Sequence, residues 1–262
     1  GVQSFFDIRP TKHEGAYFIG FDNYLKAFAD EELWSVLGRS GVWTIGSVAL
    51  QFLVAMAGAL LLQNLVGGRW LRAIFVLPWA TPLVVGALAW KLIYQPNGLF
   101  NQVLEGLGLG HVAHAWLADP NTVIYVLFAV LTWKYFGFHM ILYMAGLQGI
   151  PADLEDAARV DGANEAQVLR YITLPMLGST IRLTVYLSVL GSFQQFVLAW
   201  VLTSEGGPVN AGQLIATYLY KFGITQLKLG YGSAVAVVFF AITFLFSLGY
   251  QRIIMKQDYN AR

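Results

Sequence analysis

The sequence contains no cysteine, which excludes disulfide bonds and thiolate chemistry but leaves the redox compartment undetermined. Charged residues are also scarce, at 12% of the chain, whereas a soluble domain carries about a quarter. The formal net charge is only +1, so nothing in the composition favours a nucleic acid or another polyanion as a partner. These shortages point away from a soluble domain and from a nucleic-acid-binding protein.

Catalytic and nucleotide-binding motifs are missing as well. The sequence has no G-x-x-x-x-G-K-[ST] segment, the loop with which many proteins cradle nucleotide phosphates. Its four histidines show no zinc-type spacing, and no serine, histidine and aspartate share a plausible surface. We therefore expect no catalytic residue, no metal site and no cofactor bound by this chain, and we do not expect an enzyme.

Long apolar segments dominate instead, since hydrophobic residues make up 57% of the chain. A helix needs about 20 mostly apolar residues to span a bilayer. Five segments qualify, and they predict an all-α, polytopic membrane protein with five spanning helices: 41–63, 72–94, 122–147, 175–203 and 231–254. The sequence starts with Gly rather than Met, which leaves room for a sixth span before Gly1.

Lysine and arginine gather in alternate loops, and this bias orients the spans because cytoplasmic loops carry the excess of positive charge. One side carries Arg69, Arg72, Arg159, Arg170, Arg252, Lys256 and Arg262. The opposite loop 96–121 carries no basic residue apart from histidine, and 204–230 carries only Lys221 and Lys228. We predict a multi-pass protein of the cytoplasmic membrane of a prokaryote, with its N-terminus outside and its C-terminus in the cytoplasm.

The predicted organisation has three parts. An external segment, 1–40, contains an amphipathic helix near Asn23–Leu37. A transmembrane domain, 41–255, includes the cytoplasmic loop 149–174, and a cytoplasmic tail follows at 256–262.

The segment from Gly149 to Pro175 is polar although it lies between two apolar runs. Pro151 favours a helix start, and Gly162 followed by Asn164 favours a helix stop and a new N-cap. We predict two short helices at the membrane surface, on which another protein docks. The simpler alternative is a solvated connector with capped helices.

This segment resembles the EAA loop of binding-protein-dependent ABC importer permeases, and its surroundings resemble their maltose-type carbohydrate subgroup. The other matching segments occur in the subgroup's order: IGFDNYLKAF (19–28), RAIFVLPWATPLVVGALAWKLIYQPNGLFN (72–101), WLADPN (116–121), WKYFGFHMILYMAGLQGIP (133–151), FVLAWVLTSEGGP (196–208) and YGSAVAVV (231–238). The resemblance covers nearly the whole chain from Phe18 onward and implies the permease subunit of an ATP-driven sugar importer.

In that family the EAA loop is a coupling helix that sits in a groove of a separate ATPase subunit. The resemblance assigns this role to residues 151–161 and their flank, with these coupling residues: Leu154, Asp156, Ala157, Ala158, Asp161 and Gly162. Asp156 stands where the family usually has glutamate, which brings the carboxylate closer to the backbone. The implied partners are an ATPase dimer that binds ATP and Mg, a second homologous permease, an extracytoplasmic solute-binding protein, a sugar substrate and the lipid bilayer.

Polar and aromatic residues at membrane depth indicate the substrate path, because lipid disfavours them. An aromatic face beside an amide suits a sugar, whose C–H face stacks on the ring while its hydroxyls bond the amide. Three clusters stand out: Trp79 with Thr81; Trp133, Lys134, Gly137, His139 and Met140; and Ser192, Gln194 and Gln195. The resemblance places Trp79, Leu83, Gly137, Met140, Ser192 and Gln195 at the sugar site, and the third cluster adds Gln194.

Each cluster also has a purely structural interpretation. Gln194 and Gln195 can join helices by hydrogen bonds, and Trp79 can be a packing residue. His139 is better explained as a histidine satisfied within the bundle than as a proton relay. We expect Lys134 to form a structural or gating pair rather than to bind ligand, with a partner that the sequence does not identify.

Two functional alternatives remain open. A permease for a glycerol-phosphate-like or other polar solute is the nearest, and Lys134 would then bind the anion. A secondary transporter or channel would more naturally carry acidic residues inside its spans. Here every Asp and Glu lies in a loop or near the end of a span.

Overall fold

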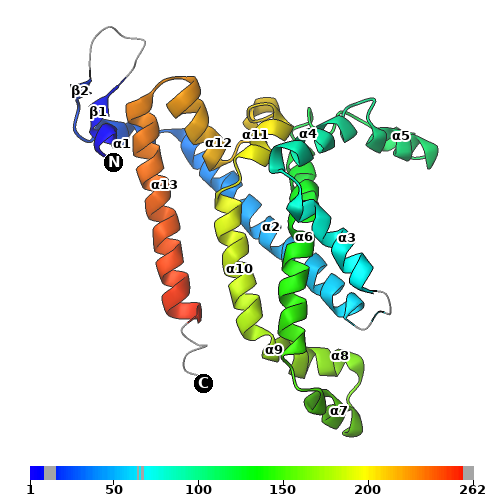
Figure 1. The fold of residues 1–262 in the computed structure, drawn as a ribbon. Helices are drawn as coiled ribbons and strands as arrows, with labels where there is room; N and C mark the ends of the chain where they lie inside the picture. The colour runs from blue at the N-terminus through cyan, green and yellow to red at the C-terminus, as the bar shows by residue number, and fades with distance from the viewer. Residues whose placement is uncertain (9–15, 64, 66–67, 256–262) are drawn as a thin grey trace. The chain divides into compact units, whose positions relative to one another are not determined.

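The computed structural model describes residues 1–8, 16–63, 65 and 68–255, and these residues are mostly helical (Figure 1). The α-helices follow in this order: α1 (Asp22–Phe28), α2 (Glu31–Leu62), α3 (Gly68–Ala80), α4 (Leu83–Ile93), α5 (Leu99–Gly106), α6 (Val123–Gln148), α7 (Ala152–Val160), α8 (Glu165–Val168), α9 (Leu174–Met176), α10 (Gly178–Phe193), α11 (Val197–Thr203), α12 (Ile215–Tyr220) and α13 (Leu229–Tyr250). Short π-helical turns follow α8, α12 and α13: Leu169–Thr173, Lys221–Thr225 and Gln251–Met255. The predicted cytoplasmic tail 256–262 lies outside the described residues.

Three helices are long and apolar enough to cross a membrane: α2, α6, and α13 with its continuation to Ile254. Two bent pairs also pass the test when each is taken as one span: Trp70–Ala80 with Leu83–Ile93, and Glu165–Met176 with Gly178–Phe193. The described residues therefore contain three to five candidate spans, and the prediction of an all-α polytopic fold is confirmed.

Two predicted spans are not single helices. The segment 72–94 breaks after Ala80, because Pro82 has no N–H to donate and disfavours a helical conformation at Thr81. The segment 175–203 breaks after Phe193, at Gln194–Phe196, where the sequence has neither proline nor glycine. Both breaks lie next to predicted sugar-site residues.

The predicted amphipathic helix near Asn23–Leu37 is also divided, into α1 and the start of α2. The side chain of Asp30 accepts hydrogen bonds from the amides of Glu32 and Leu33 and so caps α2. The first long helix therefore begins ten residues before the predicted boundary at residue 41.

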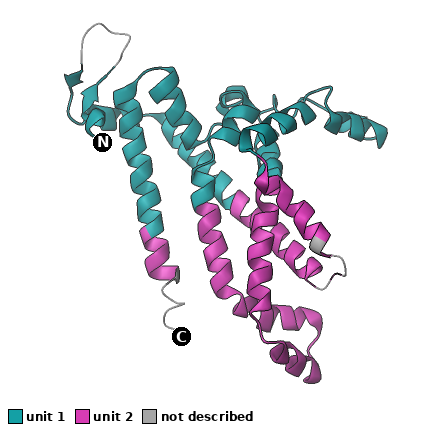
Figure 2. Ribbon diagram, viewed as in Figure 1, with its two compact units in different colours: residues 1–46, 82–131, 190–247 teal, residues 47–81, 132–189, 248–262 magenta. Residues whose placement is uncertain are grey.

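The chain forms two compact units (Figure 2). Unit 1 comprises residues 1–46, 82–131 and 190–247, and unit 2 comprises residues 47–81, 132–189 and 248–262. Four long helices contribute residues to both units: α2, α6, α10 and α13.

In unit 1, strand β1 (Phe6–Asp7) pairs antiparallel with β2 (Tyr17–Phe18). Gly230, at the start of α13, lets this strand pair approach, because a Cβ there would overlap the carbonyl oxygen of Phe6. One apolar core cluster of the unit consists of Ala27, Leu33, Val36, Ile215, Tyr218 and Val235.

Unit 2 has its own apolar core, formed by α2, α6 and the segment before α10: Ala55, Met56, Ala59, Leu62, Met140, Tyr143, Met144, Leu147 and Leu177. Glycines bring these segments close, as is usual for helices that pack in membranes. Gly58 faces the ring of Phe136, and Gly146 faces the side chains of Thr180 and Leu177.

One half-buried polar cluster in unit 1 centres on Asp30. Its Oδ2 accepts hydrogen bonds from the hydroxyls of Tyr218 and Tyr231, each at 2.6 Å. Burial alone would raise the pKa of Asp30, but these bonds and the two backbone amides outweigh it and hold the pKa below its ordinary value. The carboxylate therefore joins α12 and α13 to the start of α2.

This cluster predicts a pH-dependent stability. Because the pKa of Asp30 is lower in the folded than in the unfolded chain, its stabilisation is present above the unfolded pKa and disappears as the pH falls through the folded value. We expect Asp30→Asn to cost about 1 kcal/mol at pH 7, since neutral bonds replace charge-assisted ones. The cost should begin to fall at about pH 4, the ordinary pKa of an aspartate, and vanish once the pH is below the folded pKa of Asp30, as measured by thermal unfolding in detergent.

Asp22→Asn is the matched control for this measurement, because Asp22 is an exposed acid on α1. We expect it to change stability by less than about 0.5 kcal/mol at either pH. An Asp30→Asn effect that stays constant from neutral to acidic pH would show that the charge of Asp30 contributes nothing.

Candidate functional site

The polar segment between α6 and α10 forms the two helices that the sequence predicts. Pro151 is the N-cap of α7, and Gly162 adopts a positive φ of 87° where the chain turns back. Asn164 then caps α8 in a capping box, in which its side chain accepts the amide of Gln167 while the Gln167 side chain accepts that of Asn164. The expectations for Pro151, Gly162 and Asn164 are confirmed.

The predicted coupling residues lie mainly on the surface of this segment. Leu154 is 43% exposed although it is apolar, and Ala157, Asp156 and Asp161 are also exposed. Ala158 is half-buried. Residues 154, 157, 158 and 161 fall on one helical face, so the exposed leucine is surrounded by small or acidic side chains. The contact of this face with an ATPase stays a prediction.

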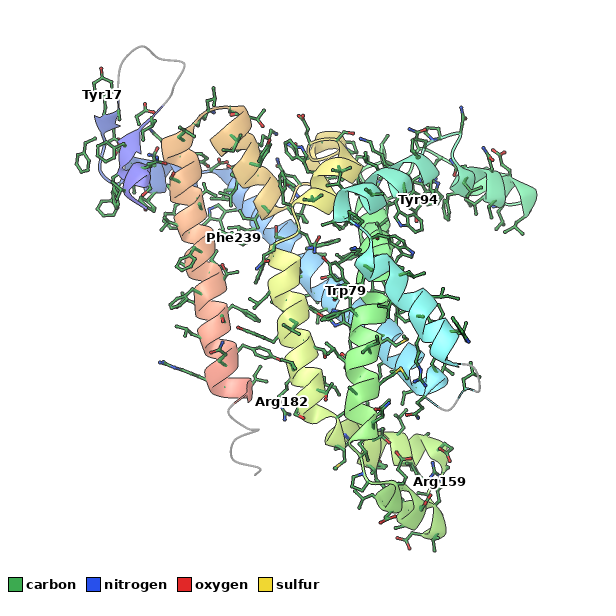
Figure 3. All side chains as sticks on the ribbon, in the orientation of Figure 1. Tyr17, Trp79, Tyr94, Arg159, Arg182 and Phe239 are labelled. Atoms are coloured by element: carbon green, nitrogen blue, oxygen red, sulfur yellow. The ribbon has the colours of Figure 1, made fainter. Side chains whose placement is uncertain are left out.

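Arg159, labelled in Figure 3, forms an ion-pair network that the sequence analysis missed. Its guanidinium lies 3.0 Å from Glu165, 3.2 Å from Asp156 and 3.5 Å from Glu155. The hydrogen bond with Glu165 raises the pKa of Arg159 and lowers that of Glu165. Asp156 therefore pairs within its own chain, and the network ties α7 to α8.

The predicted sugar-site residues are divided between the two units. In unit 2, Trp79 is 47% exposed and stacks one face on Phe138, with ring centroids 5.2 Å apart and an angle of 16°. Gly137 lies next to Phe138 on α6, and Met140 is fully buried in the core. Among these three residues, Trp79 alone presents a large exposed surface.

In unit 1, Gln194 is exposed at the break between α10 and α11, whereas Gln195 is buried. Ser192 is also buried, donates to Thr44 Oγ1 at 3.0 Å and accepts the indole N–H of Trp43 on its carbonyl oxygen. Leu83 is half-buried as the first residue of α4. The role of all seven residues in sugar binding stays a prediction.

Lys134 is buried, and the structure identifies the partners that the sequence could not. Its ammonium donates to the carbonyl oxygens of Pro78 at 2.8 Å, Trp79 at 3.0 Å and Thr81. These oxygens lie at the C-terminal end of α3, and the carbonyl of Pro78 loses its usual partner because residue 82 is proline. An ammonium has three donors, so all of them are used.

Gly137 brings α6 against the backbone of α3. A Cβ at this position would overlap the carbonyl oxygen of Phe75 and lie 2.9 Å from the Cα of Val76. Because these are backbone atoms, they cannot move aside as a flexible side chain would. A glycine is therefore needed here for packing, whatever else the position does.

His139 forms a hydrogen bond with Ser188, with Nε2 and Oγ 3.4 Å apart. This contact joins α6 to α10 and agrees with a histidine satisfied inside the bundle. Among the residues that the structure describes, no group of three His, Asp or Glu side chains could hold a metal ion.

Candidate membrane-spanning helices with an exposed two-helix segment between α6 and α10 are the arrangement expected of a membrane transport permease. The chain belongs to the family of the binding-protein-dependent transport system inner membrane component, whose model matches residues 51–257. This family membership confirms the resemblance found in the sequence, and it makes the chain a membrane-embedded subunit of a transport system.

Several curated permeases are similar to this chain over most of its length. The probable ABC transporter permease protein YurN of Bacillus subtilis is 34% identical, over 88% of this chain and 80% of that protein. The sulfoquinovosyl glycerol transport system permease protein SmoG of Agrobacterium fabrum is 33% identical, over 97% and 82%. The trehalose/maltose transport system permease protein MalF of Thermococcus litoralis is 32% identical, over 90% and 79%.

The fold also matches a solved structure. A chain of a bacterial ABC transporter involved in the import of the acidic polysaccharide alginate aligns with a TM-score of 0.80, covering 91% of this chain and 84% of that one. The two sequences are only 22% identical, so this match shows a shared fold and nothing about the substrate.

The close contact of α6 with α3 at Gly137 can be tested by mutation. We expect Gly137→Ala to destabilise the protein by about 1–3 kcal/mol, because the added methyl group must displace the α3 backbone. The change is read as a lower midpoint of thermal unfolding in detergent.

Gly191→Ala provides the control, since nothing lies within 4 Å of a Cβ built there. It should leave stability unchanged or raise it by up to about 1 kcal/mol, because alanine is the better helix former. Equal midpoints for the two variants would contradict the close contact of α6 with α3.

Proposed function

We propose that this chain is one permease subunit of an ATP-driven importer that carries an uncharged di- or oligosaccharide into the cell. It works with a second permease, identical or homologous, with a dimer of ATPase subunits that bind ATP and Mg, and with an extracytoplasmic solute-binding protein. The complex sits in the cytoplasmic membrane of a prokaryote. The described N-terminal segment faces outward, and α7 and α8 face the cytoplasm.

The exposed leucine on α7 is the observation that carries this proposal. An apolar side chain on a polar loop, surrounded by alanines and acids, supports docking into a groove of another protein. Family membership and the relatives named as ABC transporter permeases support the ATPase of such a transport system as this partner. Hydrolysis there would move α7 and α8 and bias the permease between two states.

A sugar is supported by the exposed half of the Trp79 ring and by relatives named for trehalose/maltose, diacetylchitobiose and arabinooligosaccharides. An aromatic ring of this kind stacks on the C–H face of a sugar. Gln194, exposed at the α10–α11 break, can donate to and accept from hydroxyl groups.

The hydrogen bonds of Lys134 distinguish this proposal from the glycerol-phosphate alternative. An anionic headgroup would need a free cation at membrane depth, but the three donors of Lys134 already bind carbonyl oxygens. Binding an anion would require Lys134 to give up these bonds, so we favour an uncharged substrate. The named relatives include a sulfoquinovosyl glycerol permease, so the class of substrate is tested directly with the binding protein.

Affinity purification of the tagged chain from native membranes tests the assembly. We expect an ATPase, a second permease and a solute-binding protein to co-purify. The binding protein is then titrated with trehalose, maltose and glycerol 3-phosphate. Binding of a disaccharide supports the proposal, binding of glycerol 3-phosphate alone favours the alternative, and absence of any ATPase would refute the importer.

The docking face predicts a sharp effect of charge at position 154. Leu154→Asp should weaken ATPase binding by about 2 kcal/mol or more, roughly thirtyfold, because it places a carboxylate in the centre of the contact. The measurement is the affinity of the purified permease for the ATPase.

Val160→Asp is the matched control, since Val160 is 87% exposed on the same helix but lies about 120° from Leu154 around the axis. We expect this variant to bind as the wild type does. Equal weakening by both variants would mean that α7 has no specific docking face.

A further inference from the structure

One turn of α6, Lys134–Phe138, clamps the C-terminal half of α3. We propose that this clamp makes α3 follow α6, so that movement of the coupling helices reaches Trp79 through it, with Lys134 as the positioning residue. The inference rests on the proposed function and adds the path by which the ATPase side and the Trp79 side are joined.

The polar part of the clamp is the ammonium of Lys134 on three carbonyl oxygens of α3. The C-terminal end of a helix carries a partial negative charge, which favours a cation there. A buried cation without such partners is strongly disfavoured. Separating the two helices would therefore leave the ammonium of Lys134 without its three acceptors.

The apolar part of the clamp lies on the same turn of α6. Phe136 meets Phe75 edge to face, with ring centroids 5.1 Å apart, and Phe138 stacks on Trp79. Between these two rings, Gly137 brings the backbones of α6 and α3 together. Three kinds of contact thus fix the final turns of α3, and Trp79 takes part in two of them.

The same helix leads directly to the coupling segment. α6 ends at Gln148 and α7 begins at Ala152, so only three residues join them. From Lys134 to Gln148 a helix rises by about 21 Å, at 1.5 Å per residue. Glu155 of α7 also accepts a hydrogen bond from Thr173, in the π-helical turn before α9, at 3.1 Å.

All of these parts belong to unit 2, which holds α3, the second half of α6, α7, α8 and α9 (Figure 2). Within this unit, the helices α7 and α8 lie at one end and the C-terminal end of α3 at the other. The large core cluster of α2 and α6 fills the space between them. A displacement of α7 is therefore transmitted through the packed core of unit 2 to Trp79. The hydrogen bonds of Lys134 form the last contact on this route, between α6 and α3.

Pulsed electron–electron double resonance can test this contact, because this chain has no cysteine of its own and can be labelled at chosen sites before it is assembled with its partners. We choose Leu77→Cys on α3, where the side chain is 61% exposed, and Asp153→Cys, which is exposed on α7. The distance is measured in the full complex without nucleotide and with ATP plus orthovanadate. The wild type should give one narrow distance that is the same in both states.

Adding Lys134→Met should broaden this distribution or make it differ between the two states, while ATP hydrolysis persists. Lys134→Arg should restore the narrow distance in part, since it keeps the charge but cannot place three donors in the same way. Lys91→Met is the control, because Lys91 contacts only the hydroxyl of Ser204 among the bonds of the described residues, and it should behave as wild type.

A wild-type distance that changes between the two states would overturn the proposal, and it requires no variant to fold. A Lys134→Met distribution identical to the wild type would overturn it too. A purely structural role would lower the yield of folded protein but leave the distance in the folded fraction unchanged. If no ATPase is recovered, the proposed function fails, whereas the distance width without nucleotide still reports on the clamp.

Discussion

The arrangement of unit 2 depends on a polar interaction at membrane depth: the ammonium of Lys134 on the C-terminal carbonyl groups of α3. Pro82 cannot donate to the carbonyl of Pro78, and this oxygen accepts hydrogen bonds from the hydroxyl and amide of Thr81 as well as from Lys134. The close contact at Gly137 and the stacking of Phe138 on Trp79 both require α3 to stay at this distance from α6. The break after α3 is thus held in place by its contacts with α6.

Local signals in the sequence were sufficient for the coupling segment. Pro151, Gly162 and Asn164 act on their own backbone or on that of near neighbours, so their residue types alone predict where α7 begins and ends and where α8 begins. The spans were predictable for the same reason, since length and apolarity are properties of a single segment. The break at Gln194–Phe196 was not, because neither proline nor glycine marks it.

The partners of Lys134 could not be derived from the sequence, because they lie 53 to 56 positions away and are backbone oxygens, which carry no residue signature. The Arg159 network was missed for a different reason. Its acids were noted as part of a polar segment, but only the turn at Gly162 brings Glu165 back to Arg159. The sequence also did not reveal which side chains are exposed. Trp79 and Gln194 are exposed, whereas Met140, Ser192 and Gln195 are buried.

The buried and exposed residues of the candidate spans limit which solutes the permease can transport. Transport of a charged solute through a membrane protein calls for a compensating charge along the path. In this chain the buried cation of α6 is occupied by carbonyl dipoles, and α6 and α10 carry no acidic residue. An indole face is exposed beside the break after α3 and, separately, an amide is exposed beside the break after α10. Both groups bind by stacking or by neutral hydrogen bonds, which favours a polyhydroxyl compound over an ion. In the proposed importer the free energy for moving this compound would come from the ATPase through α7 and α8, which the ion pairs of Arg159 hold together.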